Sequence, residues 1–363
     1  MKEFCKNMKG IILHGGHGTR LRPLTHTGPK QLLPIANKPM SQYALEDLKN
    51  IGITEIGIII GDVYPEKVKA FYGDGSNFGV KISYIYQDSP KGIAHAIRLC
   101  KEFIDNEDFV VYLGDNILRK NLTNYRKKFE SQNPDAMILL CEVKNPSQFG
   151  VVKMDEKMEY IKKIIEKPKN PPSNFAVIGI YFLTPKIFDI IDTLKPSWRG
   201  EFEITEALQL LMDNDGKITF DIVTGWWKDT GTPEDIIHAN KLILDSIGTK
   251  EQFLFNSEST IKNNIIIGKN SSISQETIIE GPVIIGNNCI IESTVKIGPY
   301  VSIGDNCSLK KCNIKNSILM NDCKIDTDIN IFDSIIANGS KIENAIEPKN
   351  CQFLLGERSH LKL

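Results

Sequence analysis

The segment at residues 13–35, LHGGHGTRLRPLTHTGPKQLLPI, combines glycines with side chains that can donate hydrogen bonds to an anion. Glycine lets the backbone come close to a ligand and turn its N–H groups inward. The glycines concerned are Gly15, Gly16 and Gly18. Thr19 adds a hydroxyl donor, Arg20 can bind phosphate oxygens as a fork, and Lys30 can bind them as a point charge. These residues predict a phosphate-binding loop.

Two other interpretations of this loop stay open. It could be an ordinary surface turn, because a glycine-rich stretch alone is weak evidence, and it lacks the GK[ST] of a Walker A loop. It could also hold a transition metal on His14 and His17, although no further ligands accompany this pair. We expect these histidines to hydrogen-bond phosphate instead, or, for His17, to face solvent.

A second polar group stands at Gln87, after the apolar run ISYIY. A side-chain amide offers both a donor and an acceptor, which suits the N3–H and carbonyl edge of thymine or uracil. Gly92 would let the backbone approach the same base. The alternative is that Gln87 is simply an exposed residue that follows a strand.

Alternating elements must position these residues. Strand-like runs occur at 10–13, 55–60, 82–86 and 109–113, and helical spacing of apolar residues occurs at 41–51, 65–71 and 92–104. This alternation predicts an α/β domain with a mostly parallel sheet that is covered on both faces. Such sheets bind ligands beyond the carboxyl ends of their strands. The loop at 14–30 and Asp115 of the GDN tripeptide both leave strands at that edge.

A six-residue period begins near residue 261. Isoleucine, and finally leucine, recurs at Ile261, Ile267, Ile273, Ile279, Ile285, Ile291, Ile297, Ile303 and Leu309. Small or β-branched residues mostly follow four positions later, and an unbroken period of six predicts a parallel β-helix with the isoleucines stacked inside. The register slips after Leu309, which suggests small loops or a flattened last coil. We expect Cys289, Cys307 and Cys323 to fill the tight interior.

Composition sets the remaining limits. The chain has 363 residues, of which 41% are apolar and 25% charged, as in soluble globular proteins of more than one domain. Its net charge of −1 gives no general attraction to nucleic acid or to a membrane surface. We expect reduced cysteines, a cytoplasmic location and no membrane span. The expected domains are a catalytic domain at 9–246, a linker at 247–260, a β-helix at 261–349 and a C-terminal segment at 350–363.

Read at full length, GGHGTRLRPLTHTGPKQLLPIANKPM resembles the loop of sugar-nucleotide pyrophosphorylases, G-G-x-G-[ST]-R-L-x-P-x-T followed by P-K-x-L-x-P. The resemblance extends to about residue 245 through GDGSNFGVKISY, QDSPKGIAHA, YLGDN, FGVV, EKP, GIYF, RGEFEIT and WKDTGTPED. The long form of glucose-1-phosphate thymidylyltransferase is most similar, through KQLLPI, GIAHA and the ending FLLGERSHLKL. His14 departs from the family, which usually has Ala or Ser there.

The resemblance implies a Rossmann-like nucleotidyltransferase domain followed by a left-handed β-helix. It implies that a nucleoside triphosphate is joined to a sugar 1-phosphate and that pyrophosphate is released. Asp115 and Asp229 match the family's metal aspartates and would hold Mg²⁺. A lone aspartate after a strand is more often a helix cap or turn former, but the GDN and WKDTG contexts outweigh that interpretation.

The resemblance also implies roles for single residues. The catalytic set would be Arg20, Lys30, Lys167, Asp115 and Asp229. Arg20 would stabilise the departing pyrophosphate, Lys30 would lie near the transferred phosphoryl group, and Lys167 would bind the incoming sugar phosphate. The nucleotide site would consist of Leu13, Gly15, Gly16, Gly18, Thr19, Arg20, Lys30, Gln87, Gly92 and Asp115. The sugar site would consist of Gly150, Glu166, Lys167, Val177, Arg199 and Trp227.

The motifs and the resemblance leave four hypotheses for the function of the chain. The first is Mg²⁺-dependent transfer from dTTP to glucose 1-phosphate, and the second is the same chemistry with UTP. The third, a catalytically silent scaffold, is disfavoured because all the charged site residues are present. The fourth, acyl transfer by the β-helix, is disfavoured because residues 239–359 contain no histidine. We therefore expect the β-helix to serve homo-oligomer formation or regulation, so that deleting 250–363 would change assembly size more than the chemistry.

Overall fold

The computed structural model of this chain describes residues 7–119, 121–247, 261–262, 264–343 and 349–363. The chain forms two compact units, and each unit is built from two separate stretches of sequence. The first contains Met1–Gly16 and Ser41–Lys228, and the second contains His17–Met40 and Asp229–Leu363. The expected linker at 247–260 lies, from residue 248 onward, outside the described residues. The expected domain boundaries stay a prediction.

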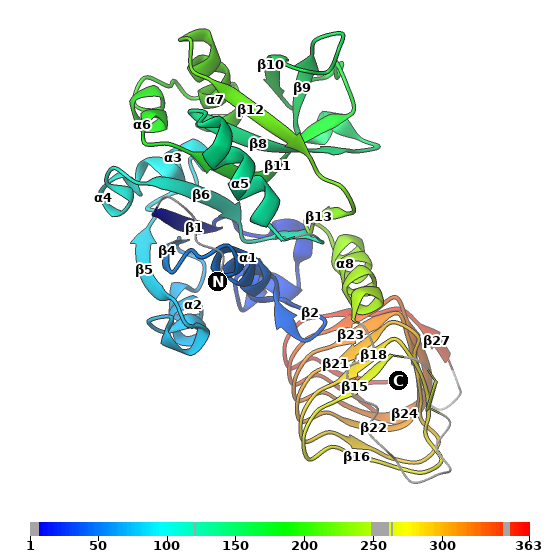
Figure 1. Cartoon of the computed structure of the whole chain (residues 1–363). Coiled ribbons are helices and arrows are strands. Elements are labelled where there is room, and N and C mark those ends of the chain that lie inside the picture. The colour runs from blue at the N-terminus through cyan, green and yellow to red at the C-terminus, as the bar shows by residue number, and fades with distance from the viewer. Residues whose placement is uncertain (1–6, 120, 248–260, 263, 344–348) are drawn as a thin grey trace. The chain divides into compact units, whose positions relative to one another are not determined.

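A nine-stranded sheet forms the centre of the first unit (Figure 1). Its parallel part runs in the order β6-β1-β4-β5. These strands are β1 (Met8–His14), β4 (Glu55–Ile60), β5 (Lys81–Tyr86) and β6 (Asp108–Leu113). All four strand predictions are confirmed, and β1 lies between β4 and β6, so the loop after β1 leaves the middle of the parallel part.

The other half of this sheet is mixed. Its strands are β8 (Ala136–Glu142), β9 (Gly150–Met154), β10 (Ile161–Glu166), β11 (Phe175–Leu183) and β12 (Ile218–Ile222). β11 joins the two halves, because it pairs antiparallel with β6 and β9 along one edge and with β8 along the other. β7 (Asn116–Leu118) lies outside the large sheet and pairs with β13 (Trp227–Asp229).

Helices cover the sheet, as the alternation of apolar runs predicts. They are α1 (Met40–Asn50), α2 (Pro65–Tyr72), α3 (Ile93–Arg98), α4 (Lys101–Ile104), α5 (Thr123–Gln132), α6 (Lys186–Ile191) and α7 (Ile204–Asp213). The expected helix at 92–104 is divided into α3 and α4 at residues 99–100. Gly10 in β1 allows α1 to pack closely, because a Cβ there would lie 2.9 Å from Leu48 Cδ1.

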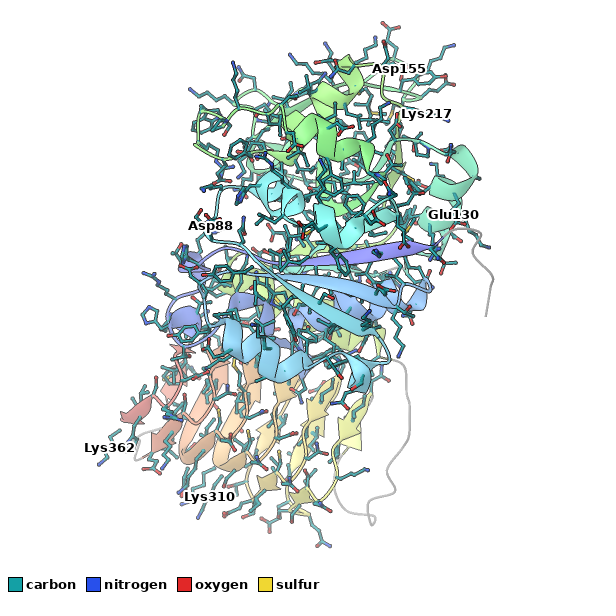
Figure 2. All side chains as sticks on the ribbon, turned by 90° about the vertical axis from the view of Figure 1, so that its left-hand side faces the viewer. Asp88, Glu130, Asp155, Lys217, Lys310 and Lys362 are labelled. Atoms are coloured by element: carbon teal, nitrogen blue, oxygen red, sulfur yellow. The ribbon has the colours of Figure 1, made fainter. Side chains whose placement is uncertain are left out.

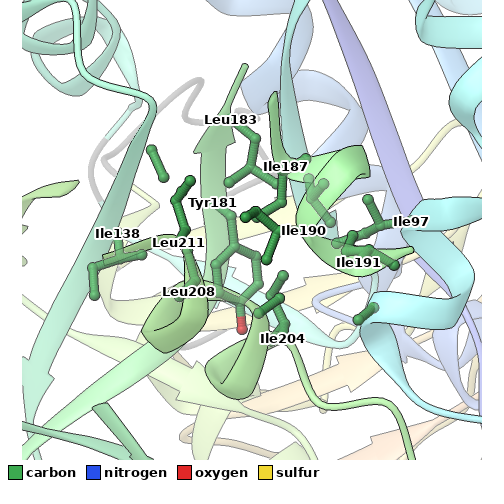
Figure 3. Packing of buried hydrophobic residues seen from close by; sticks show 14 of the residues in the cluster. Ile97, Ile138, Tyr181, Leu183, Ile187, Ile190, Ile191, Ile204, Leu208 and Leu211 are labelled. Atoms are coloured by element: carbon green, nitrogen blue, oxygen red, sulfur yellow. The ribbon is translucent and has the colours of Figure 1, made fainter. Parts of the chain in front are cut away.

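The apolar core of the first unit packs α3, α6 and α7 against β6, β8 and β11. Figure 3 shows Tyr181 of β11 surrounded by Leu208 of α7 and Ile190 of α6. Each buried aliphatic side chain of this kind contributes about 1.5–3 kcal/mol relative to exposure. The core therefore fixes β11 and the mixed half of the sheet, which carries most of the expected sugar-binding residues.

The second unit begins with the rest of the glycine-rich loop. The short strands β2 (Pro34–Ile35) and β3 (Lys38–Pro39) form a hairpin whose two turn residues, Ala36 and Asn37, both have positive φ. α8 (Pro233–Ser246) packs beside it and starts with a favourable cap, since the Thr232 side chain accepts a hydrogen bond from Asp235 N at 3.3 Å.

A parallel β-helix completes the second unit (Figure 1). Its ten-stranded sheet contains β14 (Ile261–Lys262), β16 (Ser272–Ile273), β17 (Ile278–Glu280), β19 (Ile290–Ile291), β20 (Lys296–Ile297), β22 (Ser308–Lys315), β24 (Lys324–Phe332), β26 (Lys341–Glu343), β27 (Lys349–Cys351) and β29 (His360–Lys362). Its six-stranded sheet contains β15 (Ile265–Ile267), β18 (Val283–Ile285), β21 (Val301–Ile303), β23 (Ser317–Leu319), β25 (Ile335–Ile336) and β28 (Leu354–Leu355). Together with the α/β sheet, this confirms the predicted fold class.

The six-residue period explains the coils. Ile267 pairs with Ile285, and Ile285 pairs with Ile303, so equivalent residues are 18 positions, or three repeats, apart. These isoleucines are buried, whereas charged side chains such as Lys310 and Lys362 project from the outside of the coils (Figure 2). The predicted inward stack of isoleucines is therefore confirmed for the described coils.

The register slip after Leu309 has a different form from the one expected. β22 is continuous through it and contains a bulge between Lys310 and Cys312. A bulge adds or removes a residue from the pairing without a loop. Cys289, Cys307 and Cys323 are buried inside the coils, as predicted, and are free thiols.

Across the described residues, no helix combines the length and apolar character that crossing a bilayer requires.

Candidate active site

The parallel pairing of β1 and β6 gathers one part of the expected nucleotide site. Leu13 lies opposite Leu113, and Gly114 N donates to Leu13 O at 3.0 Å. Gly15, Gly16 and Asp115 therefore leave the sheet at the same edge. Asn116 Nδ2 donates to Asp115 Oδ1 at 3.0 Å and so orients that carboxylate.

His14, at the end of β1, is 4% exposed and forms an edge-on contact with Tyr72, with ring centroids 5.9 Å apart. Among the described residues, neither ring nitrogen of His14 has a hydrogen-bond partner. Burial lowers the pKa of His14 to about 3, and the negative charge of Asp115 opposes this only in part. The side chain is therefore neutral at physiological pH. The expectation that His14 hydrogen-bonds phosphate stays a prediction, and His17 is exposed, as one of the two expectations for it had it.

The rest of the predicted phosphate-binding loop, from His17 onward, belongs to the second unit. Gly18 has φ +59°, and a Cβ there would lie 2.9 Å from Thr25 Cγ2 and 3.3 Å from Lys30 Cβ. Thr25 Oγ1 donates to Gly18 O at 2.8 Å and holds this conformation. Gly18 thus needs to be glycine, and Lys30 packs against it. Thr19 begins a short 3-10 turn (Thr19–Leu21) and is exposed.

Arg20 also meets the chain just beyond Asp229. A Cβ on Gly231 would lie 2.8 Å from an Arg20 guanidinium nitrogen, so the guanidinium lies directly over that glycine. Next to it, Thr230 Oγ1 contacts Met40 Sδ at 2.7 Å. Arg20, the predicted pyrophosphate ligand, therefore contacts Gly231 of the second unit. Gly231 follows the predicted metal ligand Asp229 by two positions in the sequence. Asp115 belongs to the first unit.

The expected base-binding residues, Gln87 and Gly92, both lie in the first unit. Gln87 follows β5, is 6% exposed, and its Oε1 would be 3.7 Å from a Cβ placed on Gly15. It is therefore not the exposed residue of the alternative interpretation. Gly92 has φ +102°, and a Cβ there would lie 2.5 Å from Phe202 O. Only glycine fits at that position, which lets the backbone of the 87–92 segment lie against residue 202.

Antiparallel pairing of β9 and β10 builds the expected sugar site. Glu166 lies opposite Gly150, and a Cβ on Gly150 would lie 3.3 Å from Glu166 Oε2 and 2.4 Å from Thr205 Cγ2. Thr205 Oγ1 donates to Glu166 Oε2 at 2.9 Å. Val177 lies in β11, next to the residue that pairs with Val151 of β9. The structure thus brings Gly150, Glu166 and Val177 to one end of the sheet.

Charged residues surround Glu166. Its Oε1 lies 3.7 Å from Lys167 Nζ and 3.5 Å from Arg199 Nη1. Arg199 also pairs with Glu201 at 2.9 Å and with Glu203 at 3.2 Å. Burial, followed by the charge of Glu166, raises the pKa of Glu203 above its ordinary value. Arg199 is therefore held by three carboxyl groups, which fixes it beside the expected sugar phosphate ligand Lys167.

Trp227 contacts both Asn116, next to Asp115, and Phe149, next to Gly150. Its Nε1 donates to Asn116 Oδ1 at 2.7 Å, and its ring packs edge-on against Phe149, with centroids 5.5 Å apart. Asn116 Oδ1 also accepts from Gly179 N at 3.2 Å. Asn116 therefore links Asp115 to the residue that precedes Gly150. No motif assigned a role to Asn116, Thr205 or Glu203, although all three lie inside the segments GDN and RGEFEIT.

The donor chemistry of the two aspartates fits Mg²⁺. Magnesium prefers carboxylate oxygens and is usually held by one or two of them, with phosphate and water oxygens as further ligands. Within the part of the chain that the structure describes, no three His, Cys, Asp or Glu side chains gather as a ready-made metal cluster. The transition-metal alternative built on His14 and His17 gains no support from this set of ligands.

Comparison with known proteins agrees with this geometry. The family model for nucleotidyl transferase matches residues 9–246, and the model for the GMPPB C-terminal domain matches residues 279–362. The low-salt glycan biosynthesis nucleotidyltransferase Agl11 of Haloferax volcanii is 46% identical over 98% of this chain and 100% of its own length. The glucose-1-phosphate thymidylyltransferase of Streptomyces antibioticus is 39% identical over 74% of this chain and 75% of its own.

A solved structure matches about two thirds of this chain. UDP-glucose pyrophosphorylase, in its complex with UDP-glucose, is 29% identical, with a TM-score of 0.59 over 66% of this chain and 99% of that one. The family predicted from the loop and the separated motifs is therefore confirmed. This chain belongs to the nucleotidyl transferase family and is a sugar-1-phosphate nucleotidyltransferase.

Proposed function

We propose that the chain transfers a thymidylyl group from dTTP to glucose 1-phosphate, which yields dTDP-glucose and pyrophosphate, with Mg²⁺ as cofactor. The strongest structural support for this proposal is the set of contacts that Asn116 makes. Asn116 ties Asp115 to Trp227, and Trp227 packs on the residue before Gly150. Two hydrogen bonds and one ring contact thus connect Asp115, a proposed metal ligand, to the proposed sugar site.

The reaction needs positioning more than covalent chemistry. An oxygen of the sugar phosphate attacks the α-phosphorus of the triphosphate and forms a new P–O bond. The bond from that phosphorus to the bridging oxygen of the β-phosphate breaks, and pyrophosphate leaves with that oxygen. Both partners are anionic, so neutralising charge and fixing the approach supply most of the acceleration.

Named residues would share this work. Lys167 would bind the sugar phosphate, and Glu166, held by Thr205, would accept hydrogen bonds from sugar hydroxyls. Arg20 and Lys30 would bind the triphosphate from the glycine-rich loop. Asp115 and Asp229 would hold the divalent cation, which supplies charge neutralisation on the phosphates. Enzymes of this family generally depend on such a cation.

UTP is the alternative nucleotide. The Gln87 amide matches an edge that thymine and uracil share, and a solved relative binds UDP-glucose. Assembly into a homo-oligomer through the β-helix is part of the same proposal.

A pyrophosphate-release screen tests both versions. The purified chain would be assayed with dTTP, UTP, CTP and GTP against several sugar 1-phosphates in the presence of Mg²⁺. We expect release with dTTP or UTP and glucose 1-phosphate. A strong preference for GTP would defeat the pyrimidine assignment, and no release with any pair, from a protein that is folded by circular dichroism, would leave the silent scaffold.

A further inference from the structure

We propose that His95 is the positioning residue that selects uracil or thymine over cytosine, because it fixes the orientation of the Gln87 side-chain amide. This inference rests on the proposed function, since it assumes that Gln87 contacts the base. His95 lies in α3, eight residues after Gln87, and received no role from the sequence.

The geometry assigns the two ends of the Gln87 amide. Gln87 Nε2 lies 3.1 Å from His95 Nδ1, so the NH₂ group points at the imidazole. Gln87 Oε1 is the atom nearest to a Cβ placed on Gly15, at 3.7 Å. The amide carbonyl therefore faces the nucleotide loop, and the donor group is turned away from it.

This arrangement requires an acceptor at His95 Nδ1. An imidazole nitrogen accepts a hydrogen bond only when it carries no proton. On the other side of the ring, His95 Nε2 lies 3.9 Å from Asp88 Oδ1, and the carboxylate favours a proton on that nitrogen. Burial, the largest influence, lowers the pKa of His95, and Lys91 and Arg98 act in the same direction against Asp88. A neutral ring protonated on Nε2 satisfies all these contacts.

Neighbouring groups hold the ring in this place. The Phe202 ring packs against it, with centroids 6.3 Å apart. The backbone of the same loop is fixed to the helix, since Ala94 N donates to Phe202 O at 3.1 Å and Phe202 N donates to Lys91 O at 2.8 Å. His95 is only 13% exposed in its side chain, whereas Asp88 is 63% exposed at the surface. The imidazole is thus a fixed partner for the buried amide.

The orientation has a consequence for the base. Uracil and thymine present a donor, N3–H, to a carbonyl oxygen, whereas N3 of cytosine is an acceptor. Two facing acceptors repel, and a site with a fixed hydrogen-bonding group rejects a ligand that cannot match it. Without His95 Nδ1, the amide is free to turn its NH₂ group toward the base, and that orientation would accept cytosine.

Equilibrium binding of dTTP, UTP and CTP to the full chain tests this idea without depending on turnover. The His95→Phe variant removes the acceptor and keeps an aromatic ring against Phe202. We expect the wild type to bind dTTP and UTP at least tenfold more tightly than CTP, and His95→Phe to lower that ratio about tenfold. His95→Gln, which can still present a carbonyl acceptor, should retain most of the preference.

Three binding results would overturn the role of His95. If His95→Phe weakens dTTP, UTP and CTP by the same factor, the residue is merely structural and the inference is overturned. An unchanged ratio in His95→Phe, or a wild type with no preference against CTP, overturns it as well. Pyrophosphate release by the wild type is measured in parallel. Its absence defeats the proposed function, whereas normal release together with an unchanged ratio defeats only the role of His95.

Discussion

The buried imidazole of His14 should make the first unit less stable as the pH falls below neutral. Its pKa is about 3 in the folded chain, against 6.5 for an exposed histidine, because burial disfavours the charged form. Between these values the unfolded chain binds a proton that the folded chain does not bind. Stability from this group is therefore fully present above pH 6.5 and is lost as the pH falls toward 3.

The size of the effect follows from the two pKa values. Each pH unit below 6.5 costs about 1.4 kcal/mol, so His14 alone should remove about 2 kcal/mol between pH 7.5 and pH 5. Urea unfolding followed by tryptophan fluorescence measures this in the relevant part of the chain. All three tryptophans, at positions 198, 226 and 227, belong to the first unit with His14.

The control is His14→Gln, which keeps a polar side chain but cannot titrate. Other groups change stability over the same range, so the relevant quantity is the difference in pH dependence between the two proteins. We expect the wild type to lose about 2 kcal/mol more than His14→Gln between pH 7.5 and pH 5. Equal losses in the two proteins would show that His14 is protonated in the folded state and that its assigned burial is wrong.

Three further predictions concern the site and its support. Asp115→Asn and Asp229→Asn should each lower pyrophosphate release at least about 100-fold, because each removes a cation ligand. Asp105→Asn makes the same change at an exposed position and should leave the rate unchanged. Near-normal turnover in either site variant would refute the metal assignment. Thr205→Val should raise KM for the sugar phosphate about 5- to 10-fold, because it removes the 2.9 Å hydrogen bond to Glu166. KM for the nucleotide should not change. Steady-state kinetics with each substrate varied measures both constants, and a raised KM for the nucleotide with an unchanged KM for the sugar phosphate would contradict the prediction. Asn240→Ala should destabilise the second unit by about 2–4 kcal/mol, because two buried donors lose their acceptor, and thermal unfolding no lower than that of wild type would contradict it.

The last of these predictions depends on a link that residue patterns did not indicate. Asn240 Oδ1 in α8 accepts from Ala36 N at 2.8 Å and from Ser302 Oγ at 2.7 Å, and Asn37 Nδ2 donates to Ile303 O at 2.6 Å. The hairpin that follows the predicted phosphate-binding loop is thus hydrogen-bonded both to α8 and to a β-helix coil. Deleting the β-helix should therefore disturb the loop as well as any assembly that the coils support.

Regular periods made the architecture predictable from the sequence. The four parallel strands follow from apolar runs between helical segments, and the coils follow from isoleucines six residues apart, because each pattern repeats one local geometry. The slip after Leu309 was visible, but its form was not, since a β-bulge depends on how neighbouring strands pair.

Candidate site residues could be predicted from the sequence only where they belong to a motif whose residue types indicate a chemical role. Gly18 and Glu166 belong to such motifs, and the structure gives each a physical reason for its residue type. Thr205 and Asn116 contact residues far away in the sequence, Glu166 and Trp227, and only the folded chain brings these residues together. The burial of His14 could not be predicted, because the sequence does not reveal that Tyr72 packs against it.

Cation-dependent transfer is tested most directly by pyrophosphate release from the wild-type chain with glucose 1-phosphate and either dTTP or UTP, before and after EDTA. We expect release that requires both substrates, stops when EDTA removes the cation, and returns when Mg²⁺ is added in excess. Release that continues unchanged in EDTA, or that proceeds without the sugar phosphate, would contradict a cation-dependent transfer between the two.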